Sequence, residues 1–425
     1  MLLDAVNGDL NFAHKNKMNK IKSLNNKNIY IIFIFVCLAS LQFYQPNFIT
    51  VNVTVWKFIY YFSITIMTAA ILIHKTTDIT IYKNKCFTFI GAFILCQLIS
   101  VYNVSQYKNQ PLGISIVATL QYVGFLAYLL LCKSNITIRQ CEKIISFFAW
   151  TFAILTILNM MGGNALFGNY EFDADRGGMR YRLPGIGWVI LFCLQNVNKY
   201  IEQRKQRNMW IAVLMFIFTV LSLTRQVMAI TFLLMVLMII YKAKIYQKIL
   251  VAIAILFATI FILPKVSIFN KMLNFTNEQM NANYDNIRIV AFNYYGFEYP
   301  RNTNEVLFGV GVPSFGKSQY GNEIDWTEEN LKVYTSDVGY IDIYFKFGIV
   351  AVICIFLAQI VCIRRKTKLK YLYAKYYLIA NMLLAIASTP YFSDTLSICL
   401  TLYILSLKSS LRGPKYQTQQ ETATI

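Results

Sequence analysis

The chain has 425 residues and a net charge of +20, with 57% hydrophobic and only 14% charged residues. A soluble globular chain is about one quarter charged. The apolar residues are gathered in blocks about as long as the roughly 17–25 residues that a helix needs to cross a bilayer, which excludes an ordinary soluble protein. Backbone groups in hydrocarbon must be paired within their own segment, so we expect these blocks to be helices.

The blocks predict an all-α polytopic membrane protein with about 12 transmembrane helices. A basic cytoplasmic tail (1–27), without a cleavable leader, precedes helices 1–9 (28–264). A partly helical extracytoplasmic loop (265–337), helices 10–12 (338–407) and a second cytoplasmic tail (408–425) follow. The expected spans are 28–44, 55–73, 86–102, 113–132, 143–161, 184–198, 208–224, 226–241, 249–264, 338–363, 371–389 and 391–407.

The placement of charge predicts the orientation. With the N-terminus in the cytoplasm, the cytoplasmic segments carry 27 Lys/Arg and 6 Asp/Glu, and the outer segments carry 13 and 14. This asymmetry is the positive-inside pattern of a multi-pass protein of the bacterial inner membrane with both termini in the cytoplasm. It also explains the basicity through topology and anionic lipid, so we expect no nucleic-acid partner.

The apolar block 210–241 is interrupted only by the residues Ser222 to Gln226. One long helix would bury Arg225 near the middle of the membrane, at a cost of at least about 2.5–3.5 kcal/mol. Two helices joined by a tight turn at 224–226 would instead place Arg225 at the outer face. Basic residues at both ends of the block favour the two-helix interpretation, because both ends then lie in the cytoplasm.

Two long segments fall outside the cytoplasm in this topology, 162–183 and 265–337. Long loops in a compact protein are usually functional or disordered. The second loop is rich in aromatic residues, which favours a packed structure. We expect a helix around 283–295 and a turn-rich strap at FGVGVPSF (308–315).

Half of the twelve arginines lie in outer segments, where the charge rule disfavours them. Arginine binds phosphate through two parallel hydrogen bonds and stays charged when partly buried, so a diphosphate is the ligand they suggest. The alternative is that those in the first loop pair with Glu171, Asp173 and Asp175. The outer arginines are Arg176, Arg180, Arg182, Arg225, Arg288 and Arg301.

Asp337 stands at the mouth of an apolar helix and fits a general base that deprotonates a sugar hydroxyl. The alternative is that Ser336 or Asp337 caps that helix, and the two roles can coexist. Asp342 lies five residues further on, on a different face, so it does not form a carboxylate pair with Asp337. Weaker candidates for the base are Asp285, Glu298 and Glu305, and Asp394 is a candidate partner for an outer arginine.

The two histidines, His14 and His74, both fall in predicted cytoplasmic segments. Histidine-dependent nucleophilic or metal chemistry is therefore excluded outside. No outer loop contains a cysteine, so no disulfide framework is expected. We expect neither a metal nor another cofactor, and the chain has no P-loop for a nucleotide.

Four segments in order resemble the O-antigen ligase/polymerase superfamily of surface polysaccharide assembly: LSLTRQVMAI (221–230), NIRIVAFNYYG (286–296), LFGVGVPSFG (307–316) and DVGYIDIYFKFGIVAV (337–352). The resemblance implies a metal-independent glycosyltransferase that acts at the outer leaflet on glycans linked to undecaprenyl diphosphate. It also implies that Arg225 and Arg288 are the family's two functional arginines. Ligases of this superfamily usually carry a histidine where this chain has Ser336-Asp337, which argues for an O-antigen or capsule polymerase.

Two alternatives remain from the sequence. A flippase or transporter of lipid-linked oligosaccharides has a similar number of spans but holds charges inside them. An O-antigen ligase is disfavoured because this chain has Ser336-Asp337 where ligases usually carry a histidine. The expected partners are undecaprenyl-diphosphate-linked oligosaccharide, membrane lipids, and the chain-length regulator and flippase of the same pathway.

Overall fold

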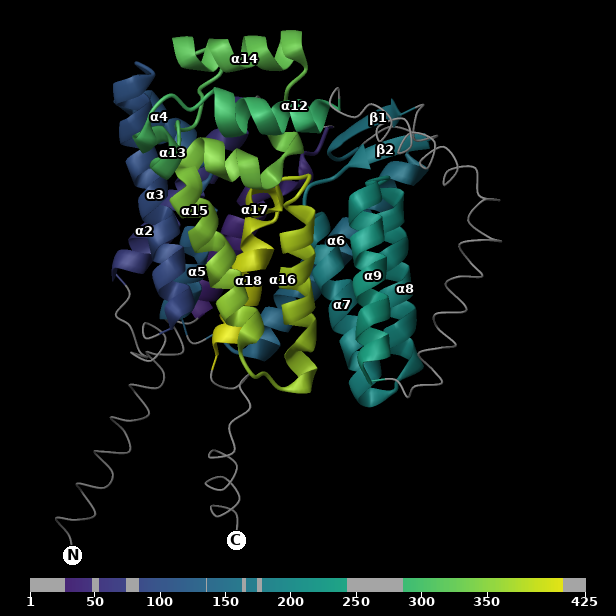
Figure 1. Ribbon diagram of the computed structural model, residues 1–425. Helices are drawn as coiled ribbons and strands as arrows, with labels where there is room; N and C mark the ends of the chain where they lie inside the picture. Colours follow the sequence, from purple (N-terminus) through teal and green to yellow (C-terminus); the bar gives the residue numbers. More distant parts are fainter. Residues whose placement is uncertain are drawn as a thin grey trace, which may run out of the picture.

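The computed structural model describes residues 27–47, 53–73, 84–134, 136–162, 166–173, 178–242 and 286–407. In these ranges the chain forms a bundle of helices that is covered at one end by a layer of short helices (Figure 1). This helical architecture agrees with the all-α prediction. The structure also contains a feature that was not predicted, an antiparallel hairpin of β1 (Asn169–Asp173) and β2 (Gly178–Arg182) in the first long loop.

The helices of the bundle follow the predicted apolar blocks. Each predicted span except 249–264, which lies outside the described residues, coincides with a helix or with a broken pair of helices. In chain order they are Lys27–Ser40, α2 (Val53–Ile73), α3 (Lys85–Tyr107), α4 (Leu112–Leu120), α5 (Leu126–Lys133), α6 (Ile138–Met161), α7 (Ile186–Gln203), α8 (Gln206–Leu221), α9 (Arg225–Lys242), α15 (Gly339–Arg364), α16 (Leu372–Leu384), α17 (Pro390–Ser393) and α18 (Thr395–Ser406).

Among the described residues, α2, α3, α6 and α15 are each long and apolar enough to cross a membrane. A fifth crossing is formed if α4 and α5, which are bent by 58° at a short break, count as one broken span. Shorter apolar helices, α8, α9 and α18 among them, accompany these. The chain is therefore an integral membrane protein, and the count of about twelve spans stays a prediction.

Local sequence explains where two of the long helices begin. The side chain of Asn84 accepts a hydrogen bond from the Cys86 backbone N–H at 3.0 Å and caps α3. Thr137 and Gln140 form a reciprocal capping box at the start of α6. Both caps satisfy backbone N–H groups that have no partner within the helix.

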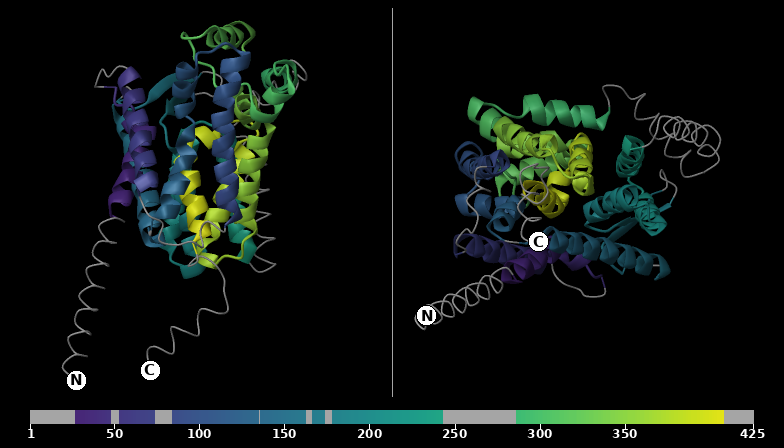
Figure 2. Two further views of the ribbon diagram at one scale, coloured as in Figure 1. Left: turned by 90° about the vertical axis from the view of Figure 1, so that its left-hand side faces the viewer. Right: turned by 90° about the horizontal axis from the view of Figure 1, so that it is seen from below.

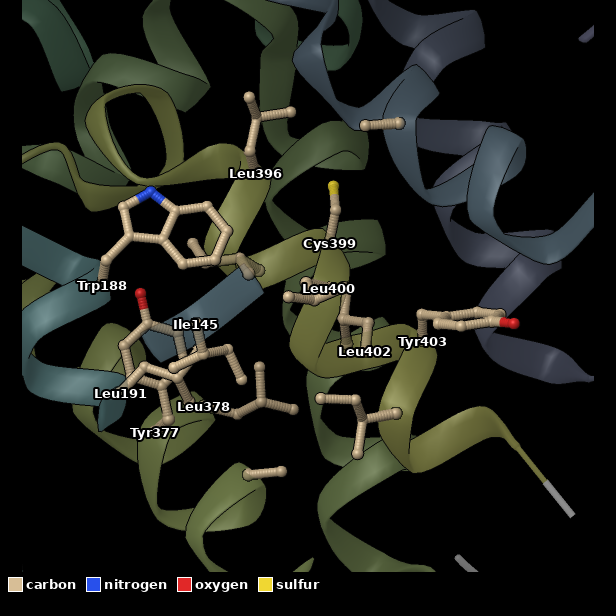
Figure 3. Packing of buried hydrophobic residues seen from close by; sticks show 14 of the residues in the cluster. Ile145, Trp188, Leu191, Tyr377, Leu378, Leu396, Cys399, Leu400, Leu402 and Tyr403 are labelled. Carbon is tan, nitrogen blue, oxygen red and sulfur yellow. The ribbon is translucent and has the colours of Figure 1, made fainter. Parts of the chain in front are cut away.

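The centre of the bundle is occupied by α18, whose side chains are almost all buried. Figure 3 shows side chains of α7, α16 and α18 converging there, with Trp188 of α7 beside Leu396 of α18. The hydroxyl of Tyr403 donates to the backbone oxygen of Ile136 at 2.9 Å, which ties α18 to the start of α6. The hydroxyl of Tyr403, although buried in this core, is thus paired with a backbone atom.

Residues 286–337, here called the cap layer, cover one end of the bundle (Figures 1 and 2). The expected helix is present as α12 (Ile287–Asn293), and it continues into a π-helical turn, η6 (Tyr294–Glu298). The other elements are α13 (Thr303–Phe308), α14 (Gln319–Leu331) and η7 (Thr335–Asp337). Tyr295, Tyr299 and Tyr320 pack with Phe345 of α15 into a separate buried cluster, so the aromatic residues of the loop do form a core.

The strap between α13 and α14 runs beside a break in α15. Gly348 interrupts that helix with φ +82°, and Gly309 of the strap also has φ +82°. The Val310 N–H donates to the Phe345 carbonyl oxygen at 2.8 Å, and the Gly311 N–H donates to that of Lys346 at 3.2 Å. The strap therefore satisfies the carbonyl groups that the break leaves open, as irregular backbone within a membrane protein requires.

We expect Gly309→Ala and Gly348→Ala to destabilise the protein. At either position an added Cβ would overlap the backbone of the other segment, and both residues have φ values that disfavour alanine. The free energy of unfolding should fall by more than about 1 kcal/mol for each variant. Thermal melting of the purified protein in detergent measures this effect.

The matched controls are Gly91→Ala in α3 and Gly113→Ala in α4, because nothing lies within 4 Å of an added Cβ at either position. These two should melt at or above the temperature of the unmodified protein. Melting of all four variants at the same temperature would contradict the proposed role of the strap.

Candidate functional site

Arg225 is the first residue of α9, directly after the tight turn at Ser222–Thr224, in which Leu223 has φ +49°. The prediction of two helices in place of one over-long helix is confirmed. The side-chain amide of Gln226 donates to the backbone oxygens of Leu383 and Leu384, each at 3.1 Å. These bonds fix the start of α9 against the end of α16.

Asp337 is half-buried at the end of η7, two residues before α15 begins. The residue that caps α15 is Val338, without a side-chain hydrogen bond, so the expectation that Ser336 or Asp337 caps this helix is wrong. The Tyr340 N–H donates to the Ala385 carbonyl oxygen at 3.0 Å. Arg225 and Asp337 therefore flank the same short connection, the one between α16 and α17.

Arg288 and Arg301 both lie in the cap layer with exposed side chains. Arg288 is in the first turn of α12, and Arg301 precedes α13. The Arg301 backbone N–H donates to the Glu305 carboxylate at 2.6 Å, and the other Glu305 oxygen is 3.4 Å from the Lys108 ammonium. These contacts make Glu305 a structural residue, which weakens it as a base. Glu298 is exposed, and Asp285 lies outside the described residues.

The arginines of the first loop are associated with the hairpin. Arg180 of β2 is directly opposite Glu171 of β1, and Arg182 is opposite Asn169. Arg182 is exposed, and Arg176 lies outside the described residues. Substrate binding by these three arginines stays a prediction.

A buried ion pair that the sequence analysis missed lies in the first half of α15. The Lys346 ammonium is 2.5 Å from an Asp342 carboxylate oxygen, and both side chains are more than nine-tenths buried. The same ammonium lies over the ring of Tyr122 at 4.8 Å and near that of Phe392 at 5.4 Å. The four-residue spacing of Asp342 and Lys346 was the available signal, because it puts opposite charges on one helix face.

Glu328 of α14, in the cap layer, interacts electrostatically with this pair. Burial raises the pKa of Glu328, while nearby Lys346 and a hydrogen bond from the Thr335 backbone lower it. The cap layer and α15 thus share one group of charges, two carboxylates and one ammonium.

Asp394, between α17 and α18, is buried, and no arginine among the described side chains forms an ion pair with it. In the described part of the chain it accepts the Gly187 N–H at 3.0 Å, and the Ser393 hydroxyl lies 3.3 Å from its other oxygen. Gly187 is in the first turn of α7, where backbone N–H groups lack partners within the helix. The position of this carboxylate is therefore set by the N-terminus of α7.

We expect Lys346→Met to reduce the free energy of unfolding by about 3–5 kcal/mol, because it leaves the Asp342 carboxylate buried and unpaired. The double variant Lys346→Met/Asp342→Leu should recover most of this loss, since it removes both charges. Melting in detergent compares the two proteins. A Lys346→Met variant as stable as the unmodified chain would show that the ion pair is not what holds the two groups there.

Comparison with known proteins gives one family. Residues 210–356 match a family model described as O-antigen ligase, and a search of curated proteins finds no match. The matched segment begins in α8 and ends in α15, so it contains Arg225, Arg288 and Asp337 together with the strap and the cap layer. This match confirms the predicted resemblance: over residues 210–356 the chain is similar to the O-antigen ligase/polymerase superfamily, whose members are glycosyltransferase-like proteins of surface polysaccharide assembly.

Proposed function

We propose that the protein polymerises oligosaccharide repeat units linked to a lipid diphosphate, at the outer leaflet of the bacterial inner membrane. The observation that carries this proposal is the arrangement of Arg225 and Asp337 around the α16–α17 connection, within the matched segment. A basic group and a carboxylate at one end of the bundle supply the two functions that this glycosyl transfer needs, stabilisation of a diphosphate and acceptance of a proton.

In the proposed reaction a hydroxyl oxygen of the acceptor sugar attacks the anomeric carbon of the donor. The bond between that carbon and the diphosphate oxygen breaks, and the lipid diphosphate leaves with the electron pair. Asp337 takes the proton of the acceptor hydroxyl and later releases it to water. Arg225, assisted by Arg288, stabilises the negative charge of the departing diphosphate. No nucleotide and no metal ion takes part.

One position argues against the ligase alternative. Ser336 and Asp337 stand where ligases of the superfamily carry a histidine, and both histidines of this chain precede residue 75. The flippase alternative expects charges within spans that face a substrate path. Asp342 and Lys346 are such charges by position, but they are paired with each other and buried.

The proposal requires the cap layer to lie outside the cytoplasm. Exposed basic residues, among them Arg204, Lys205 and Arg207, gather at the α7–α8 turn, away from the cap layer. An impermeant thiol reagent added to whole cells with a permeable outer membrane should label Glu329→Cys in α14 and leave Lys205→Cys unlabelled. The nine native cysteines are all buried and give a low background. Labelling of Lys205→Cys alone would show that the orientation is the reverse of the proposed one.

Arg225→Ala and Arg288→Ala should each abolish polymer in cells and leave lipid-linked single repeat units and the protein level unchanged. The reason is the loss of charge stabilisation on the leaving diphosphate. Lysine should restore activity poorly at both positions, because it lacks the two parallel donors of arginine. Arg204→Ala, at the opposite end of the bundle, is the control. Normal polymer from both alanine variants would show that the site has been misplaced.

Asp337→Asn should lower the turnover of the purified protein by about 10²–10⁴-fold, the usual contribution of a general base, with little change in KM. The melting temperature should not change, because Asp337 does not cap α15. Asp325→Asn in α14 is a matched control for a half-buried carboxylate of the cap layer. Full activity of Asp337→Asn would remove this residue from the mechanism and direct attention to Asp285 or Glu298.

A further inference from the structure

A cavity of about 250 Å³ lies at the end of the bundle that carries the hairpin. Its walls come from the end of the helix Lys27–Ser40, the first turns of α2 and α7, and the α17–α18 junction. The segment that leads into α2 is tied to the base of the hairpin, because the Gly168 N–H donates to the Tyr44 carbonyl oxygen at 3.0 Å. The cavity, here called the hairpin-side cavity, therefore opens at the same end as the cap layer.

The floor of the cavity lies at the break between α4 and α5. Gln121 is exposed at this break, and its backbone oxygen accepts a hydrogen bond from Tyr60 of α2 at 3.4 Å. Broken helical backbone in a membrane protein is tolerated where it lines an aqueous cavity, and Gln121 and Gly124 of this break line the present one. The bend of the pair thus creates a polar recess inside the bundle.

Asp394 lines the same recess, and it lacks a basic partner in the described part of the chain. Its contacts are the Gly187 N–H and the Ser393 hydroxyl. A carboxylate accepts about four hydrogen bonds, so Asp394 retains free acceptor positions. A buried carboxylate with unused acceptor positions is suited to a ligand that brings hydroxyl donors.

The remaining walls combine aromatic rings with polar groups. Trp56, Tyr60 and Tyr61 are half-buried, and Lys57 is exposed at the rim. Aromatic faces with a few convergent polar groups are the usual construction of a small-molecule site. A sugar ring offers an apolar face to the rings and adjacent hydroxyls to the polar groups. The volume lies just below the about 300 Å³ at which drug-sized pockets begin, so it suits one ring rather than a whole oligosaccharide.

The position of the cavity relates it to the reaction site. None of its lining residues lies in the segment 210–356 that matches the family. It is separated from the start of α15 only by α17, where Phe392 faces the cavity and the hydroxyl of Tyr391 is 3.2 Å from that of Tyr340. The cavity and the start of α15, which follows Asp337, are thus linked through the contact of Tyr340 with Tyr391.

We infer that the hairpin-side cavity binds one non-reacting sugar ring of the glycan and selects the repeat unit that the protein accepts. The identity of the ligand as this glycan rests on the proposed function. Asp394 accepts hydrogen bonds from two sugar hydroxyls, Gln121 holds a third, and Trp56 covers the apolar face. The family segment then supplies the shared chemistry, and the rest of the chain supplies specificity.

The test is calorimetric titration of the purified full-length chain with the lipid-free repeat-unit oligosaccharide, prepared by cleaving the native polysaccharide. Asp394→Asn and Gln121→Ala should each weaken binding about tenfold or more, as expected for a lost hydrogen bond to a charged group or to an amide that lines the cavity. Asparagine retains an oxygen for the Gly187 N–H, and Gln121 is exposed, so both variants should fold. Their melting temperatures verify this.

Matched controls come from α14: Glu329→Gln changes an exposed carboxyl and Trp326→Phe an exposed indole, and both should bind as the unmodified chain does. Trp56→Phe should weaken binding where Trp326→Phe does not. The inference is overturned if the unmodified chain binds no oligosaccharide, or if the cavity variants bind as well as the controls. Cavity-dependent binding by a protein that makes no polymer would instead refute the proposed function and leave the site in place.

Discussion

The crossing of two glycine backbones, Gly309 and Gly348, is the contact on which the upper half of the structure depends. A break in an apolar helix exposes carbonyl groups that hydrocarbon cannot satisfy. Here the strap supplies the missing donors to Phe345 and Lys346, and only glycine lets the two chains approach so closely. This crossing fixes the cap layer on the first half of α15, and with it the position of Asp337 just before that helix.

The same geometry explains why the family segment includes both the turn and the loop. Arg225 is held against the end of α16 by its neighbour Gln226, and the start of α15 is held there by Tyr340. The strap, in turn, orients α15. Residues more than a hundred positions apart are thus brought to one end of the bundle by hydrogen bonds to the backbone oxygens of Leu383, Leu384 and Ala385. In the proposed function, a lipid diphosphate in the outer leaflet binds at this end of the bundle.

Much of this architecture was predictable from local pattern. The spans follow from apolar length, and the two-helix turn at Arg225 follows from the charges around it. The sequence did not predict the hairpin or the bend between α4 and α5, because both depend on distant partners. Asp337 was wrongly considered a helix cap, since the residue that precedes α15 is set by packing against Ala385 and not by its own side chain. The pair of Asp342 with Lys346 could have been predicted from the four-residue spacing of the two residues. It was missed because Asp342 was considered only as a partner for Asp337.

The central claim is that this protein makes glycosidic bonds with lipid diphosphate as the leaving group. The most direct measurement uses purified protein in lipid nanodiscs, with lipid-diphosphate-linked single repeat units as the only glycan, a chelator, and no nucleotide. The account predicts a ladder of lipid-linked multimers, with one lipid diphosphate released for each new bond. Single repeat units that remain unchanged in the presence of folded protein would contradict it.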